Sequence, residues 1–135
     1  MLHENTMIMM ADGSTRNIRD IKIGDSVWTE TGCSNICNIY SGWECSFVKV
    51  VSSSGLNISL TASQPIKLED GWKRVSEIEI GDKCMSKNYT DDKVESIQIV
   101  TEDAKVYSLE FDEVVGICAN DFIVGDMKRE QSRLD

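Results

Sequence analysis

A short segment near the start of this chain occurs again further along, and this repetition limits the folds that the chain can adopt. Residues 18–25 read IRDIKIGD and residues 75–82 read VSEIEIGD, so the two copies lie 57 positions apart (75 minus 18). An Asp-Gly pair precedes each copy, at residues 12–13 and 70–71. This agreement favours duplication over coincidence. Two units that cannot bury their apolar faces alone are expected to pack about a pseudo-two-fold axis and form one core.

The residues of the repeated unit predict turns and short extended segments. Asp-Gly is typical of hairpin turns, because glycine tolerates a positive φ. The apolar positions Ile18, Ile21 and Ile23 do not all fit a period of two. We therefore expect one tight 3₁₀ or helical turn over residues 18–21, followed by extended chain that leads through Gly-Asp into another strand.

Helical periodicity is almost missing from the rest of the chain. Short runs rich in Val, Ile, Tyr and Phe alternate with clusters of Gly, Asp, Asn and Ser, which is the pattern of strands and turns. With 135 residues, the chain suits one domain that buries its own core. The sequence therefore predicts an all-β domain, with strands at 6–10, 25–29, 35–40, 45–52, 56–61, 64–68, 82–86, 94–101, 105–111, 114–119 and 121–124.

Charge and hydrophobicity exclude several classes of function. The chain has 14 basic and 23 acidic side chains, a net charge of −9, and no Lys/Arg cluster before its last nine residues. We therefore expect no binding to nucleic acid or to anionic membranes. No run approaches the roughly twenty apolar residues of a membrane span, and no export signal is visible. These features predict a cytoplasmic protein.

The five cysteines do not follow the spacing of a zinc site. Their number is odd and their spacing irregular, and the one histidine, His3, lies far from them in the sequence. Reduced thiols in a reducing compartment are the expectation. The sequence predicts neither a cofactor nor a metal. The cysteines are Cys33, Cys37, Cys45, Cys84 and Cys118.

Three segments carry motifs in a fixed order: NTMIMMADGSTRNIRDIKIGDSV (5–27), LTASQPIKLEDGWKRVSEIEIGDKC (60–84) and VYSLEFDEVVGICANDFIVGD (106–126). They resemble the three blocks of the Hint superfamily, the self-processing domains of hedgehog proteins and inteins. The resemblance implies an all-β horseshoe of two pseudo-symmetric halves, in agreement with the repeat. It covers residues 1–126, which we take as the domain, and leaves 127–135 as a polar tail that is disordered or an expression remnant.

The resemblance also implies a chemistry that starts at the first residue. In this family a cysteine thiol at position 1 attacks the carbonyl before it and converts an amide into a thioester. A threonine and a histidine of the second block polarise that peptide and protonate the departing amine. A final asparagine then cyclises onto its own carbonyl with help from neighbouring histidines.

This sequence departs from the family at most of those places. By alignment the nucleophile position holds Met1, whose thioether cannot form a thioester, while Thr61 is retained. Gln64 stands at the histidine position of the second block, and an amide does not exchange protons near neutral pH. In the last block Val115 replaces the helper histidine, and Gly125-Asp126 replaces the closing His-Asn.

The missing groups decide the function that the sequence predicts. A general acid or base contributes about 10²–10⁴-fold, and loss of the nucleophile costs on the order of 10⁶. We therefore expect a Hint-like domain that has lost most or all splicing and acts as a structural or interaction module. Its partners would be the flanking segments of its own host polypeptide, and we expect a monomer.

Two alternatives stay open at this point. In the first, the domain keeps N- or C-terminal cleavage, with Met1 in place of a native cysteine and slow cyclisation at Asp126. Cleavage before residue 1 or after residue 126 would identify it. In the second, the chain is a β-barrel binding module whose motifs match by accident, and then residues 6–29 and 64–87 would lack similar backbones.

A few other side chains could carry chemistry, and each also has a plain structural interpretation. His3 is the only histidine, and a lone histidine near a terminus is usually solvated. Trp28, Trp43 and Trp72 are spread thinly, which favours packing over a ligand platform. Cys118 lies near the processing end and is the one candidate for a displaced nucleophile, although a cysteine in an apolar run is usually inert.

Overall fold

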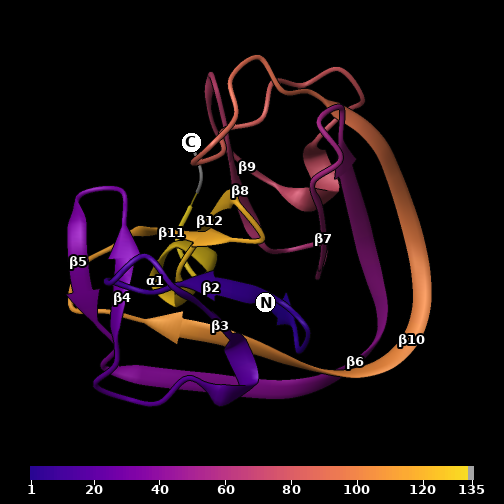
Figure 1. The fold of residues 1–135 in the computed structure, drawn as a ribbon. Coiled ribbons are helices and arrows are strands. Elements are labelled where there is room, and N and C mark those ends of the chain that lie inside the picture. Colours follow the sequence, from indigo (N-terminus) through magenta and orange to yellow (C-terminus); the bar gives the residue numbers. More distant parts are fainter. Residues whose placement is uncertain (134–135) are drawn as a thin grey trace.

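The structure, a computed structural model, describes residues 1–133 and consists of two antiparallel sheets (Figure 1). The first is a closed barrel in the order β1-β10-β6-β7, and the second has the order β3-β2-β11-β12-β8-β9, with β4 paired to β11 and β5. The barrel strands are β1 (Leu2–His3), β6 (Asn38–Ser52), β7 (Asn57–Leu60) and β10 (Val94–Glu110). The others are β2 (Met7–Met9), β3 (Thr15–Asn17), β4 (Ser26–Thr29), β5 (Gly32–Asn35), β8 (Pro65–Leu68), β9 (Gly71–Arg74), β11 (Gly116–Ala119) and β12 (Phe122–Gly125). The all-β prediction is confirmed.

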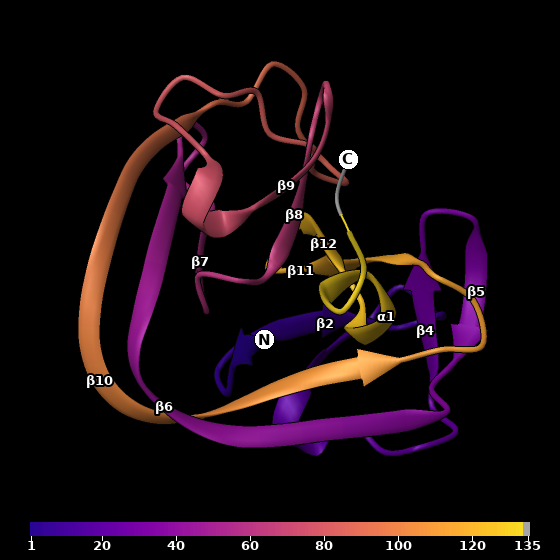
Figure 2. The ribbon, with the colours of Figure 1, turned by 180° about the vertical axis from the view of Figure 1, so that it is seen from behind.

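One long ribbon gives the molecule its curved shape. Strands β6 and β10 pair in antiparallel fashion from Val94 opposite Ser52 to Glu110 opposite Asn38. They arch together around one side of the molecule, as both views show (Figures 1 and 2). The sequence predicted separate strands at 94–101 and 105–111. The structure instead joins them through a register shift between Thr101 and Ala104, because a bulge takes up the extra residues without ending the strand.

The two copies of the repeated segment have the same local structure. A 3₁₀ turn follows the Asp-Gly hairpin in each copy, at η1 (Ile18–Asp20) and at η2 (Val75–Glu77). Gly24 and Gly81 then adopt φ of +93° and +96°, which favours glycine. Their N–H groups donate to the carbonyls of Ile36 and Val94. The predicted tight turn is therefore present in both copies, whereas the pseudo-two-fold axis stays a prediction.

Other parts of the strand prediction differ from the structure. The segments 35–40 and 45–52 belong largely to the single strand β6, and β1, β3 and β9 lie outside the predicted strands. Residues 82–86 form no strand and pair only through isolated bridges at Lys83, Cys84 and Ser86.

Residues 127–130 of the predicted polar tail form a short helix, α1 (Met127–Glu130), so this part is not disordered. The helix forms because the Asp126 side chain accepts a hydrogen bond from the N–H of Arg129 in its first turn, and because the side chain of Met127 is buried. Residues 134–135 of the tail lie outside the described residues.

One continuous apolar core contains side chains from both sheets. Its largest fully buried side chains include Phe111, Phe122 and Ile8, and a smaller cluster of Phe47, Ala104 and Val106 packs against Met1. Within residues 1–133, no helix has the length and apolar character needed to cross a membrane.

Candidate functional site

The first residue of the chain lies against the end of β7. Strand β1 fits between β10 and β7, with Leu2 opposite both Tyr107 and Leu60. The backbone N–H of Thr61 donates to the carbonyl of Met1 at 3.0 Å. This register brings the Met1 amino nitrogen to 2.6 Å from the Thr61 Oγ1. The hydroxyl oxygen of Thr61 can therefore accept a hydrogen bond from the nitrogen of residue 1.

A carboxylate from the far end of the chain meets the same nitrogen. Glu130, the last residue of α1, forms an ion pair with the Met1 amino group. Burial lowers the pKa of this amino group, and the neighbouring Glu130 carboxylate acts in the opposite direction. The first residue is thus in direct contact with a residue near the other end of the described chain.

Gln64 is fully buried, and its amide hydrogens are donated to groups other than those of Met1. Its Nε2 donates to the carbonyl of Gly125 at 2.8 Å and to that of Pro65 at 3.1 Å. Its Oε1 is buried with no hydrogen-bond partner among residues 1–133. The side chain therefore connects the start of β8 to the end of β12, and no hydrogen bond of its amide reaches the amino nitrogen.

The closing pair Gly125-Asp126 is tightly packed. A Cβ added at Gly125 would lie 2.9 Å from Pro65 Cβ and 3.0 Å from Arg129 Cδ, which leaves no room for a side chain. Asp126 is fully buried. Its Oδ1 accepts from the N–H of Arg129 at 2.9 Å and its Oδ2 from the N–H of Val115 at 3.4 Å. Burial raises the pKa of this carboxyl.

Arg129 packs against Trp72 and over Gly125. Its guanidinium Cζ lies 4.0 Å from the centre of the Trp72 ring, in the geometry of a cation–π contact. Its Nε is buried and has no partner within the described part of the chain. Arg129 therefore fills the space above Gly125 that a longer side chain at that position would need.

The structure thus brings the aligned residues together. The Met1 nitrogen contacts the Thr61 hydroxyl, and the Gln64 amide contacts the Gly125 carbonyl. The Asp126 carboxyl accepts from the backbone N–H of Val115. Sequence reasoning missed Glu130 and Arg129, which come from the segment taken as a tail. The signal that could have found them is Asp126 itself. Aspartate is a favoured N-cap, so it could have predicted a helix that begins at the next residue.

Two individual predictions are wrong. His3 is buried rather than solvated, because β1 inserts it between Phe47 and Glu102. Trp43 is 74% exposed rather than packed, because it lies on the part of the ribbon where β6 pairs only with β10. Cys118 is buried, as is usual for a cysteine in an apolar run, and burial raises the pKa of its thiol to about 12.

The side chains of residues 1–133 include no group of three His, Cys, Asp or Glu that could hold a metal ion. Cys33, Cys37 and Cys45 are exposed free thiols, and Cys84 and Cys118 are buried ones.

The chain resembles several solved structures. A DnaB intein from Synechocystis sp. PCC 6803 matches with a TM-score of 0.83 at 20% identity, over 93% of this chain and 96% of that one. A bacterial intein-like domain from Clostridium thermocellum matches with a TM-score of 0.79 at 21% identity, over 93% and 96%. The gp41-1 intein matches with 0.76 at 20% identity, over 91% and 95%. No protein-family model and no curated protein matches the sequence. The chain therefore has the Hint fold of inteins, as its motifs predicted.

Proposed function

We propose that this chain is an intein-type domain that no longer cuts its host polypeptide and instead holds the segments on its two sides together. The observation that carries the proposal is that the segment after Asp126 folds onto the domain: Asp126 caps α1, Met127 is buried, and Glu130 Oε1 contacts the nitrogen of residue 1, which is a peptide N–H in a host polypeptide. Glu130 lies four residues beyond Asp126, the position after which C-terminal cleavage would fall. A segment that a splicing domain would release is here part of the folded domain.

The surroundings of the first residue support the loss of N-terminal cleavage. Met1 offers no thiol, and the group at the histidine position, Gln64, cannot donate a proton to a departing amine. Its amide hydrogens are also engaged by the carbonyls of Pro65 and Gly125. Of the positions aligned with catalytic residues, only Thr61 has a side chain within hydrogen-bond distance of the nitrogen of residue 1 among the described residues. A hydroxyl stabilises charge there but has no nucleophile to assist.

The surroundings of Asp126 support the loss of C-terminal cleavage. Cyclisation would require the carboxyl to leave its two backbone donors, the N–H groups of Arg129 and Val115. The carbonyl that it would attack accepts from the N–H of Glu130 at 3.0 Å in the first turn of α1. The two hydrogen bonds to the carboxyl must break before it can attack, and Val115 offers no imidazole to assist.

The proposal is tested by expressing the domain between its native flanking sequences and measuring fragment masses. We expect the parent chain and the Met1→Cys variant to stay intact, because the thiol alone restores neither the acid nor its position. Met1→Cys/Thr61→Ala is the matched control. Fragments cut before residue 1 in Met1→Cys that disappear in the double variant would refute the proposal.

A second candidate function rests on the 2.6 Å contact between Met1 and Thr61. If the natural chain carries cysteine at position 1, this contact is the one that would assist a slow acyl shift. The domain would then be an autoprocessing domain with N-terminal cleavage only. The same Met1→Cys experiment separates the two, because only this candidate produces Thr61-dependent fragments.

A further inference from the structure

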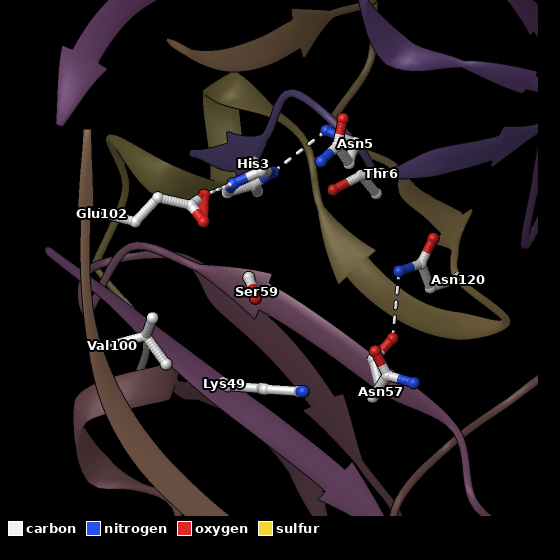
Figure 3. Close-up of a pocket in the computed structure, with 9 residues that line it drawn as sticks. All are labelled: His3, Asn5, Thr6, Lys49, Asn57, Ser59, Val100, Glu102 and Asn120. Carbon is white, nitrogen blue, oxygen red and sulfur yellow. Dashed lines mark hydrogen bonds and ion pairs between the residues drawn. The ribbon is translucent and has the colours of Figure 1, made fainter. Parts of the chain in front are cut away.

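A second polar place lies outside the site where the chain ends meet, and the proposed function makes no use of it. A cavity of about 340 Å³ opens between strands β6, β7 and β10 on one side and the loop after β1 and the turn between β11 and β12 on the other (Figure 3). Of the side chains that line it, only Val100 is apolar. Its size lies at the lower end of the range for small-molecule sites.

One wall of the cavity is held in place by its own hydrogen bonds. Asn120 adopts φ of +48°, its Oδ1 accepts from the N–H of Met7 at 2.8 Å, and its Nδ2 donates to the carbonyl of Asn57 at 3.0 Å. This asparagine therefore ties β2 to β7 across the cavity. Asparagine tolerates a positive φ better than other side chains do, apart from glycine.

The opposite wall carries a histidine whose orientation is fixed. The His3 ring lies edge-on to Phe47 with centroids 4.8 Å apart, and its Nδ1 accepts from the N–H of Asn5 at 3.0 Å. The proton of the neutral ring is therefore on Nε2, where it faces the Glu102 carboxylate. Figure 3 shows this chain of contacts at the edge of the cavity. It fixes one oxygen of Glu102 and leaves the other free.

Two opposite charges face the cavity without pairing with each other. Within residues 1–133, the Glu102 Oε2 has no hydrogen-bond partner, and the Lys49 ammonium has neither a hydrogen bond nor an ion pair. Lys49 stands opposite Ser59 in the register of β6 and β7 and reaches the cavity from β6, whereas Glu102 reaches it from β10. A simple anion would be repelled by Glu102, and a simple cation by Lys49.

We infer that this cavity binds a small zwitterion, an amino acid or dipeptide, with its ammonium group at Glu102 and its carboxylate at Lys49. The amide of Asn57 and the hydroxyl of Ser59 line the cavity and supply further hydrogen bonds. Charge-assisted hydrogen bonds at both ends would fix the orientation of the ligand. This site and its occupant are independent of whether the domain cleaves its host.

Titration of the isotopically labelled chain with glycylglycine, followed by amide chemical shifts, tests the inference. We expect saturable shifts at His3, Lys49 and Asn120 at millimolar peptide. N-acetylglycylglycine lacks the ammonium and glycylglycinamide lacks the carboxylate, so each should bind at least about tenfold more weakly. Absence of saturable shifts, or equal binding of either blocked peptide, would overturn the inference.

Variants locate the two charges. Lys49→Gln and Glu102→Gln should each weaken glycylglycine binding about tenfold. The matched control is Lys22→Gln/Glu113→Gln, which makes the same changes at exposed positions away from the cavity and should bind as the parent does. Acetate that binds as tightly as glycylglycine would identify a simple anion site and contradict the zwitterion. The comparison of glycylglycine with the two blocked peptides uses the unchanged protein, so its outcome does not depend on the stability of a variant.

Discussion

Gly125 offers the sharpest test of how the closing pair of the site is packed. A Cβ at this position would lie 2.9 Å from Pro65 Cβ and 3.0 and 3.2 Å from Arg129 Cδ and Cβ. The proline ring is rigid, so the neighbours cannot move aside without shifting β8 or α1. Overpacking of this kind costs about 1–3 kcal/mol of the free energy of unfolding. We therefore expect Gly125→Ala to be destabilising by that amount.

Urea denaturation measures the effect. With an m value of about 1–3 kcal/mol/M, the midpoint of Gly125→Ala should fall by roughly 1 M. The matched control is Gly42→Ala in β6, where the added Cβ would meet only Val106 Cγ2 at an ordinary 3.8 Å. This control should stay within about 0.5 kcal/mol of the parent.

The same contact predicts the effect of a histidine at position 125, the residue that the resemblance to the Hint superfamily implies there. Gly125→His places an imidazole where Pro65 and Arg129 already lie, so we expect a larger loss of stability than for alanine and no cleavage after residue 126. A Gly125→Ala variant as stable as the parent would refute the packing argument. Cleavage in Gly125→His would show that the position is open to an imidazole.

Three further predictions concern ionisable groups. Burial alone would raise the pKa of Asp92, but hydrogen bonds from Ser54, Ser52 and Ser53 lower it to about 2. Its stabilisation is therefore present above about pH 4 and lost as the pH falls toward 2, and Asp92→Asn should lower the free energy of unfolding at neutral pH by about 1–3 kcal/mol and remove this acid dependence in urea titrations. For Asp126 burial raises the folded-state pKa, so stability should fall as the pH rises through that pKa, and the fall should be absent in Asp126→Asn. Iodoacetamide should alkylate the three exposed cysteines of the folded chain and spare Cys84 and Cys118, as mass spectrometry can show, because burial raises the pKa of these two thiols to about 11 and about 12.

The strands and turns were largely predictable because they depend on local patterns. Alternating apolar residues located most strands, and the apolar positions of the repeated segment that do not fit a period of two located the 3₁₀ turns. Residues 82–86 were misread because a short apolar run does not reveal whether a partner strand continues alongside it. Leu68 and Phe122 meet that segment only at single bridges.

The contacts that define the candidate site were less predictable, because they join distant parts of the chain through charge. Glu130 and Arg129 belong to a polar segment without an apolar face, so periodicity gives them no structure. Contacts with Met1 and Trp72, which lie far away in the sequence, hold Glu130 and Arg129 in place. His3 was misplaced for the same reason, since its burial depends on the insertion of β1 between two strands of the barrel.

The closeness of the chain ends depends on strand register and on none of the reactive side chains. Leu2 lies opposite Leu60 at the end of β7, and Val124 lies opposite Ile66 at the start of β8. Residues 60 and 66 are separated by six residues, which span at most about 20 Å even when extended. The start of β1 and the end of β12 must therefore lie near one another whenever these two pairings form. Both pairings form with Met1, Gln64 and Val115 at their positions, so the proposed function, in which the domain joins two segments of a polypeptide without cutting them, needs only the strand register.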